Sequence, residues 1–218
     1  MIYEERRIIL KRSALPAFQA WHRTAYAPTL AAGARVLCLL GGLIGNPVEE
    51  LLRITRFPDV TTWERTQNLT GLQGASALVE REEVRLLRAI SARPKPHLPG
   101  ADHRSVYGYR RFFVKPSDLD EFIHCSADGI WPRIEAQGAC ILGLWTTVAA
   151  ADPREVVLLT GYQSPSHWDA TRTYQPKPSD MPQELWDNGN RLLARRNELT
   201  LRSWVCLMRA LELENVNG

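Results

Sequence analysis

Three side chains of the sequence are candidates for moving protons or holding an anion: His22, Tyr26 and Arg110. His22 and Tyr26 stand four residues apart, and residues at that spacing share one face of a helix. An imidazole that faces a cavity can act as a general acid or base near neutral pH, and a phenol can donate a hydrogen bond. The alternatives are a core histidine that hydrogen-bonds a backbone carbonyl and a tyrosine that only packs.

Arg6 and Arg110 are expected in the middle of strands, where a buried unpaired charge is costly. Each arginine therefore either pairs with a nearby carboxylate or points at an anionic ligand. Both alternatives stay open at the level of the sequence.

Aromatic residues are the third chemical feature, because the 218 residues include seven tryptophans. Aromatic side chains of the second half can wall a pocket for a planar ligand, although each can also belong to the core. The residues that we expect to bind substrate are Arg6, Tyr109, Phe112, Trp145, Tyr162 and Trp168.

An internal repeat indicates which elements position these residues. Residues 3–18 align with 107–122 at an offset of 104, and seven of the sixteen positions are identical. Residues 49–57 then align with 154–162 at an offset of 105, and Trp63 falls on Trp168 at that same offset. Near the end, 88–90 aligns with 209–211. The chain is therefore a tandem duplication.

Each copy predicts the order strand, helix, strand, strand, helix, strand. Ser13 and Ser117 are expected to cap the first helix of each copy, and Pro28 and Pro132 to kink or break its end. The order is that of the ferredoxin-like α+β fold, and two such repeats predict a fused dimeric α/β-barrel. The predicted strands are 7–10, 35–41, 51–57 and 83–90 in the first copy and 111–114, 140–148, 156–162 and 202–210 in the second.

The predicted domains are a first repeat over 1–91, a proline-rich linker over 92–105 and a second repeat over 106–218. The second repeat carries an insertion of about sixteen residues within 174–190, before its last strand. Such an insertion is either a lid or binding element, or a neutral addition.

Composition and motifs restrict the function classes. The net charge is +3 with scattered Lys and Arg residues, so we expect no nucleic-acid partner, and the longest apolar run, 36–44, is too short for a membrane span. The sequence has no GxGxxG, P-loop or GxSxG motif and no cluster of metal ligands, so no metal or other cofactor is expected. Its four cysteines lie in apolar segments without a CxxC pair, which favours buried thiols in a cytoplasmic protein.

Two segments of the second copy, YGYRRFFVKPSDLDEF (107–122) and GLWTTVAAADPREVVLLTGYQSPSHWDATR (143–172), resemble the NIPSNAP family of the dimeric α/β-barrel superfamily. The first copy diverges more, with Gly41 and Gly42 where the second has Trp145 and Thr146. The resemblance implies a ligand cavity between sheet and helices or within the barrel. Relatives in the superfamily include cofactor-free monooxygenases, polyketide cyclases, isomerases and haem-binding enzymes.

These observations predict an enzyme that needs no metal or nucleotide and acts on a hydrophobic or aromatic small molecule, such as a biosynthetic intermediate. Cyclisation, isomerisation and monooxygenation all fit, and His22, Arg110 and Tyr26 are the predicted catalytic residues. The alternatives are a haem protein with His22 as the axial ligand and a non-catalytic binding or scaffold protein. A fused pair is compatible with a monomer and with a homodimer.

Overall fold

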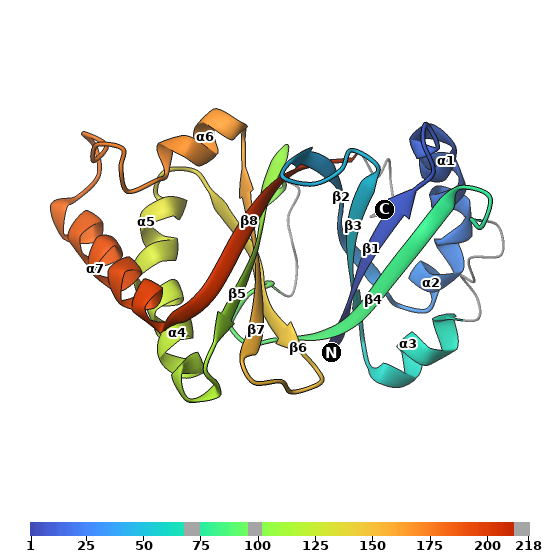
Figure 1. Ribbon diagram of the computed structural model, residues 1–218, viewed down its shortest axis with the longest axis horizontal. Helices are drawn as coiled ribbons and strands as arrows, with labels where there is room; N and C mark the ends of the chain where they lie inside the picture. The colour runs from blue at the N-terminus through green and yellow to red at the C-terminus, as the bar shows by residue number, and fades with distance from the viewer. Residues whose placement is uncertain (68–74, 96–101, 212–218) are drawn as a thin grey trace. The chain divides into compact units, whose positions relative to one another are not determined.

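The computed structural model describes residues 1–67, 75–95 and 102–211. They form two compact units (Figure 1): unit 1 comprises Met1–Arg88 and Met208–Gly218, and unit 2 comprises Ala89–Leu207. The last strand of each repeat crosses this division, β4 (Val79–Ala89) after Arg88 and β8 (Thr200–Ala210) after Leu207. The predicted linker, 92–105, belongs to unit 2, and its residues 96–101 lie outside the described residues.

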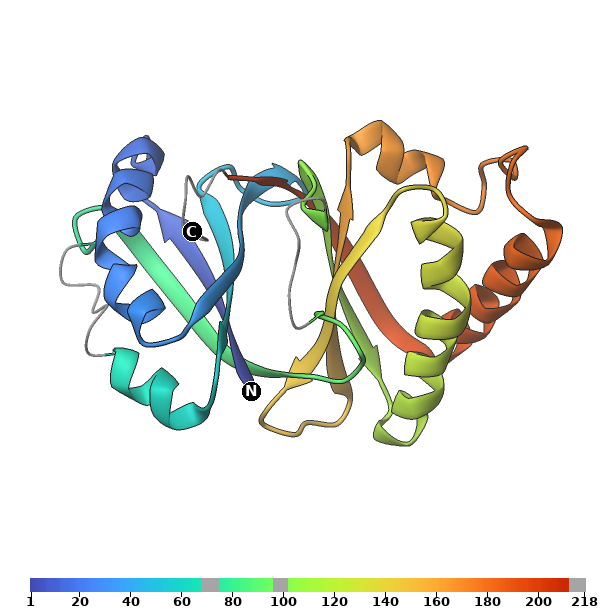
Figure 2. The ribbon, with the colours of Figure 1, turned by 180° about the vertical axis from the view of Figure 1, so that it is seen from behind.

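Unit 1 is an antiparallel sheet with helices on one of its faces (Figures 1 and 2). The sheet order is β4-β1-β3-β2, and β1 pairs with both β3 and β4. This is the strand order of a ferredoxin-like repeat. Besides β4, its elements are β1 (Ile2–Leu10), α1 (Leu15–Ala25), α2 (Ala27–Ala31), β2 (Arg35–Ile44), β3 (Glu50–Phe57) and α3 (Val60–Gln67).

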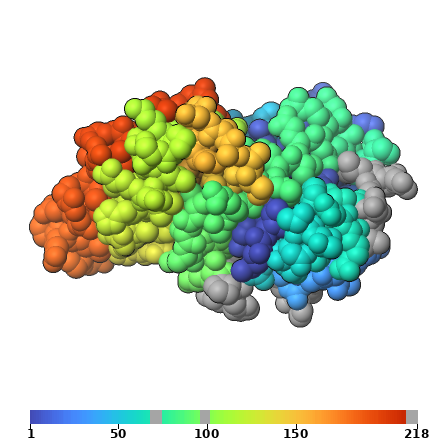
Figure 3. Space-filling view, turned by 90° about the horizontal axis from the view of Figure 1, so that it is seen from below, coloured from blue at the N-terminus to red at the C-terminus, as the bar shows by residue number. Residues whose placement is uncertain are grey.

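Unit 2 repeats the arrangement, with the sheet order β8-β5-β7-β6. It contains a helix with no counterpart among the described residues of unit 1, α7 (Gln183–Leu199), which contacts α4 and α5. Figure 3 shows α7, in orange, directly against the yellow-green residues of those helices. Its other elements are β5 (Val106–Val114), η3 (Pro116–Asp118), α4 (Leu119–Cys125), the π-helical turn η4 (Ser126–Ile130), α5 (Trp131–Glu135), β6 (Cys140–Thr147), β7 (Arg154–Tyr162) and α6 (Pro165–Ala170).

The predicted fold class is confirmed: the chain is α+β, with two ferredoxin-like repeats of the dimeric α/β-barrel type. All eight predicted strands are present, although β1 and β5 begin five residues before the predicted starts. Pro28 and Pro132 lie in the first turns of α2 and α5, so the first helix of each repeat is interrupted there as predicted.

Two local predictions differ from the structure. The predicted serine caps are wrong, because α1 is preceded by Ala14 and α4 by Asp118, and neither helix has a side-chain cap. Ser13 instead adopts a φ of 63°, in a turn. The predicted insertion, 174–190, is a loop only up to residue 182, because α7 begins at Gln183.

Alternation along β5 determines which side chains meet the helices, because successive residues of a strand point to opposite faces. Phe112 packs against Phe122 of α4, with ring centroids 5.0 Å apart, so Arg110 and Gly108 lie on the same helix-facing side. Tyr109 therefore lies on the opposite face of the sheet.

Cys38, Cys125 and Cys140 are buried and Cys206 is partly exposed, and all four are free thiols. None of the described helices combines the length and the apolar character needed to cross a membrane.

Candidate functional site

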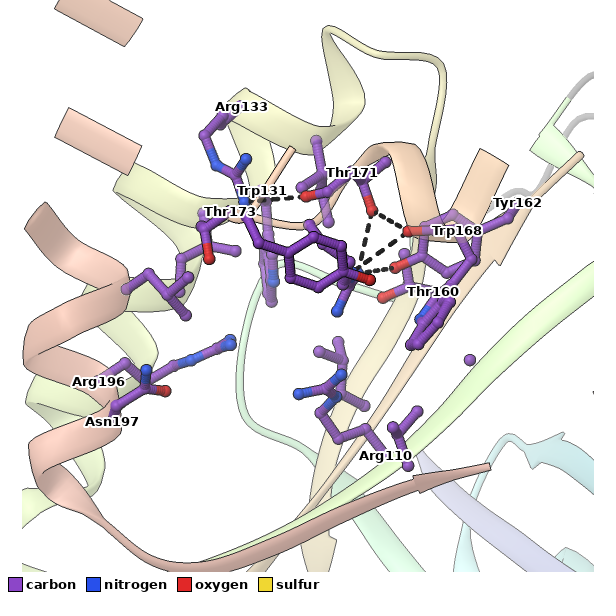
Figure 4. Close-up of a pocket in the computed structure, with 18 residues that line it drawn as sticks. Arg110, Trp131, Arg133, Thr160, Tyr162, Trp168, Thr171, Thr173, Arg196 and Asn197 are labelled. Atoms are coloured by element: carbon purple, nitrogen blue, oxygen red, sulfur yellow. Dashed lines mark hydrogen bonds between the residues drawn. The ribbon is translucent and has the colours of Figure 1, made fainter. Parts of the chain in front are cut away.

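A pocket of about 200 Å³ lies in unit 2, between the helix-facing side of the sheet and helices α5, α6 and α7. Strands β5, β7 and β8 form its floor, and the loop that follows α6 contributes Thr173 and Tyr174 from the edge of the predicted insertion. Trp131, Tyr162 and Trp168 give it aromatic walls (Figure 4).

Four arginines line this pocket: Arg110 from β5, Arg133 from α5, Arg172 after α6 and Arg196 from α7. In Figure 4 the guanidinium of Arg196 extends from α7 toward the space that it shares with Arg110. No aspartate or glutamate lines the pocket, and none of the four arginines forms an ion pair within the part of the chain that the structure describes.

The hydrogen bonds that hold these arginines use only neutral acceptors. Arg133 Nη2 donates to the Thr171 carbonyl at 3.3 Å, and Arg196 Nη1 donates to Ser126 Oγ at 3.3 Å. Arg172 Nη2 donates to Thr171 Oγ1 at 3.0 Å and to the Tyr162 hydroxyl at 3.3 Å. These contacts orient the guanidinium groups without neutralising their charge.

Several buried donors at the pocket have no acceptor among the described residues. They are Nε and Nη1 of Arg133, Nε of Arg196 and the indole Nε1 of Trp131. A buried donor without a partner costs about 1–3 kcal/mol, and more when it is charged. The site therefore has capacity for acceptor atoms that the described chain does not supply.

The arginines also lower one another's pKa. Burial and the neighbouring charge of Arg172 lower the pKa of Arg110 to about 10. Burial, Arg110 and Arg172 lower the pKa of Arg196 to about 9, and burial followed by Arg172 lowers that of Arg133. Arg110 and Arg196 stay protonated at neutral pH, so the pocket concentrates positive charge that a bound anion would relieve.

Three of the predicted site residues, Arg110, Tyr162 and Trp168, line this pocket. Phe112 lies behind it, where the Arg196 guanidinium sits 4.9 Å from its ring centroid. Tyr109 is not among the lining residues, because it lies on the opposite face of the sheet.

Trp145 does not line this pocket either. It follows Leu144, which packs in the helix-facing core, so alternation directs Trp145 to the opposite face of β6. Its side chain is fully buried, and its ring covers Gly143, where a Cβ would lie 2.3 Å from the ring.

Arg6 takes the first of the two roles considered for it, pairing with carboxylates. Its Nε donates to Glu4 Oε1 at 2.8 Å and its Nη1 to Glu82 Oε2 at 2.6 Å. Both carboxylates lie within unit 1 and occupy the Arg6 guanidinium there. Arg110, its equivalent in the second repeat, has no such partner among the described residues.

His22 and Tyr26 lie in the buried interior of unit 1. Their rings stack with centroids 4.9 Å apart, Arg53 Nη1 donates to His22 Nε2 at 3.0 Å, and the Tyr26 hydroxyl bonds Thr55 Oγ1 at 3.0 Å. Burial and the charge of Arg53 lower the pKa of His22 to about 3. The imidazole is therefore neutral at pH 7, with its Nε2 lone pair engaged by a guanidinium. It does not fit as an axial haem ligand, because that lone pair is the one a haem iron would need.

Sequence reasoning missed Arg133, Arg172 and Arg196. Arg133 and Arg196 come from helices whose packing depends on α7, which the sequence did not predict. Arg172 aligns with Gln67 of the first copy, so a search for arginines that are present only in the second copy would have found it.

Gly189 of α7 positions Arg133, because a Cβ at this glycine would lie 2.6 Å from Arg133 Cδ and 2.8 Å from Arg133 Cβ. Replacing a helical glycine with alanine ordinarily stabilises a protein by about 1 kcal/mol. We expect Gly189→Ala to destabilise this one by about 1 kcal/mol instead, because overpacking against Arg133 outweighs the gain in helix propensity. Urea unfolding measures the change, and an ordinary gain in stability would show that Arg133 moves aside at no cost.

No protein-family model and no curated protein matches the sequence. Solved structures with a similar fold include a candidate monooxygenase from Lactobacillus acidophilus, with a TM-score of 0.61 at 10% identity over 96% of this chain and 93% of that one. An anthrone oxidase-like protein has a TM-score of 0.57 at 11% identity, over 97% and 91% of the two chains. A NIPSNAP domain protein from Burkholderia xenovorans, 14% identical, covers 45% of this chain and 99% of its own at a TM-score of 0.34, which is too low to carry an argument. The first two likenesses establish the fold alone.

Proposed function

We propose that the chain is an enzyme whose active site is the arginine-rich pocket of unit 2. Its substrate is a hydrophobic or aromatic small molecule, and its reaction is a cyclisation, an isomerisation or a monooxygenation that requires no metal or nucleotide. One observation carries the proposal: four guanidinium groups line an aromatic-walled pocket, and no carboxylate of the described residues joins them. The fold is that of a candidate monooxygenase and of an anthrone oxidase-like protein, which is consistent with an enzyme.

The three reactions share a first step, in which a carbon next to a carbonyl group loses a proton and an enolate oxyanion forms. Arg110 is the group that we assign to stabilise this oxyanion, because it lines the pocket without a carboxylate partner among the described residues. Tyr162 accepts a hydrogen bond from Arg172, so its own hydroxyl proton remains for the substrate. Tyr162 is therefore the residue that we assign to donate a hydrogen bond to the forming oxyanion, while a hydroxide ion from the solvent takes the carbon proton and becomes water.

In the monooxygenation, the enolate carbon, which was a CH₂ group before it lost its proton, attacks dioxygen. One oxygen atom ends as the carbonyl oxygen of the product, and the other leaves as water with the two hydrogens of that group. The substrate supplies all the electrons, so the step needs no external reductant. His22 and Tyr26 have no part in this scheme, since both are engaged in the interior of unit 1.

Proton exchange tests the shared first step without knowledge of the final product. The purified protein in D₂O is expected to accelerate deuterium incorporation at the acidic carbon of 2-tetralone, followed by NMR. Arg110→Met should lower kcat/KM by at least about tenfold, equal to about 1.4 kcal/mol of transition-state stabilisation. Arg191→Gln is the matched control, because Arg191 is an exposed arginine of α7 that does not line the pocket.

Oxygen uptake with anthrone distinguishes the monooxygenation from the other two reactions, with one O₂ consumed and one anthraquinone formed per anthrone. Exchange without oxygen uptake would assign a cyclase or isomerase. Binding of 2-tetralone without any deuterium exchange would indicate a binding protein and refute the proposed enzymatic activity. Exchange that survives Arg110→Met would place the reaction outside this pocket.

A further inference from the structure

One difference between the two repeats lies at the third residue of their first strands. Glu4 of β1 pairs across the sheet with Thr55, and Gly108 of β5 pairs with Thr160. Thr55 and Thr160 are themselves equivalent in the repeat alignment. Glu4 and Gly108 therefore occupy the same place in the two ferredoxin-like units, and a carboxylate in unit 1 corresponds to a missing side chain in unit 2.

The Glu4 carboxylate has a complete shell of donors. Arg6 binds it with two nitrogens, Nε to Oε1 at 2.8 Å and Nη2 to Oε2 at 3.0 Å, and Trp63 Nε1 donates to Oε2 at 2.8 Å. Arg53 Nη2 donates to Oε1 at 3.3 Å and Gln67 Nε2 to Oε2 at 3.4 Å. Burial opposes ionisation of Glu4, yet its bonds to Arg6 and the charge of Arg53 lower its pKa to about 2. Glu4 is therefore a tightly bound internal carboxylate.

In unit 2, residues equivalent to most of these donors are present, but they surround a pocket and not a carboxylate side chain. The repeat alignment places Arg110 at Arg6, Trp168 at Trp63 and Arg172 at Gln67, and all three line the pocket beside Gly108. Of the Glu4 donors only Arg53 is lost, because Leu158 stands at its position.

The second carboxylate that binds Arg6 is lost as well. Glu82 aligns with Ser203 at the offset that relates 88–90 to 209–211. Arg133 and Arg196 then add positive charge from helices α5 and α7. Unit 2 therefore has donors at the positions of three of the four residues that bind Glu4, and it lacks both carboxylates that bind Arg6.

We propose that the pocket of unit 2 binds a carboxylate group of its substrate at the place that the Glu4 carboxylate occupies in unit 1. The inference rests on the proposed function, because it names the chemical class of substrate for the same site. Arg110 receives the carboxylate through Nε and Nη2, as Arg6 receives Glu4, and its Nη1, which in Arg6 binds Glu82, is left for the enolate oxyanion. Trp168 Nε1 and Arg172 supply further donors. The apolar or aromatic part of the acid lies against Trp131 and Tyr162.

The size of the pocket limits this acid to a compact molecule. A volume of about 200 Å³ corresponds to about seven water molecules at about 30 Å³ each. A side chain at position 108 would fit with little change in the surrounding residues. A Cβ there would lie 3.3 Å from Tyr162 Cε2 and 3.8 Å from the Thr160 oxygen and Val205 Cγ2. A small shift of the Tyr162 ring is sufficient.

Benzoate, benzamide and inorganic phosphate are the probes that test the proposal on the full chain. Benzoate is expected to raise the melting temperature by several degrees at saturation, while benzamide and phosphate leave it nearly unchanged. Calorimetric titration should give a Kd for benzoate that weakens at least tenfold in Arg110→Met and is unchanged in Arg191→Gln. A response to phosphate but not to benzoate would overturn the assignment of a carboxylate.

Gly108→Glu transplants the internal carboxylate of the first repeat into the second. It should raise the melting temperature without ligand and abolish the response to benzoate, because the new side chain takes the place of the ligand. Gly108→Gln is the matched control: it fills the same space without charge, so it should also lose benzoate binding but gain no stability. Equal melting temperatures for the two variants would overturn the proposal.

The wild-type titration and Arg110→Met keep the test decisive even if Gly108→Glu does not fold. Equal binding of benzamide and benzoate would refute the carboxylate site. The proposed function would still stand in that case, provided that deuterium exchange into neutral 2-tetralone persists. The absence of both benzoate binding and 2-tetralone exchange would refute the inference and the proposed function together.

Discussion

Replacing Arg110 and Arg196 together with methionine should raise the free energy of unfolding of the ligand-free protein by about 2–4 kcal/mol. Both guanidinium groups are removed from water without a carboxylate partner among the described residues, and the charge of Arg110 further lowers the pKa of Arg196. Methionine keeps most of the length of the side chain and has no charge to desolvate. For a chain of this size, each kcal/mol corresponds to roughly 2–4 °C in melting temperature.

The two single variants should not add up to the double variant. Arg110→Met alone removes the repulsion that Arg110 exerts on Arg196, so replacing Arg196 as well gains less than it would alone. A double-mutant cycle by urea unfolding measures this coupling. Arg195→Met is a useful comparison, because the exposed Arg195 pairs with Glu121 and Glu198, and its loss should bring no gain. Loss of stability in the double variant would mean that the arginines are neutralised by groups outside the described residues.

Acidification should destabilise the protein through His22 at a higher pH than through Glu4. The folded-state pKa of His22 is about 3, well below the ordinary value of 6.5, so the unfolded chain binds a proton that the folded chain excludes. This contribution to stability is complete above about pH 6.5 and is lost as the pH falls toward 3. At about 1.4 kcal/mol per pH unit, lowering the pH from 7 to 5 should cost about 2 kcal/mol.

The buried carboxylate of Glu4 contributes in a different pH window. Its pKa of about 2 lies below the ordinary 4.5, so its stabilisation is present above about pH 4.5 and is lost as the pH falls toward 2.

Urea unfolding of wild type and His22→Gln at several values between pH 5 and 7 isolates the histidine. The variant still offers Arg53 an acceptor but does not titrate, so its stability should be nearly flat over this range. Parallel curves for the two proteins would show that His22 is not the group responsible.

The fold could be predicted from the sequence because duplication doubles the evidence for each element. Every strand appears twice in the sequence, so a weak pattern in one copy is supported by the other, and the ferredoxin-like order follows. Arg110, Tyr162 and Trp168, which line the candidate pocket, could be predicted as site residues from their residue type and predicted strand or helix.

The rest of the site depends on tertiary packing that the sequence does not display. Arg133 and Arg196 reach the pocket only because α7 packs on α4 and α5, and this helix begins inside a segment that looked like a loop. The roles of Arg6 and Arg110 diverge because Glu4 and Glu82 bind Arg6, whereas Gly108 and Ser203 stand at their places in the second copy. His22 was predicted to face a cavity, and the structure places Arg53 against it instead.

The crossing of β4 and β8 between the units limits how this protein can be divided. Leu211 N donates to the Leu39 carbonyl at 2.9 Å within unit 1, and Ile90 N donates to the Leu144 carbonyl at 3.1 Å within unit 2. A cut in the linker would give two fragments that each match one repeat of the sequence, and each would lack the strand end that covers β2 or β6. Those strands would then present unpaired edges, which favour aggregation. The two sequence repeats therefore do not coincide with the two compact units, and a fragment that holds one repeat would lack part of its unit.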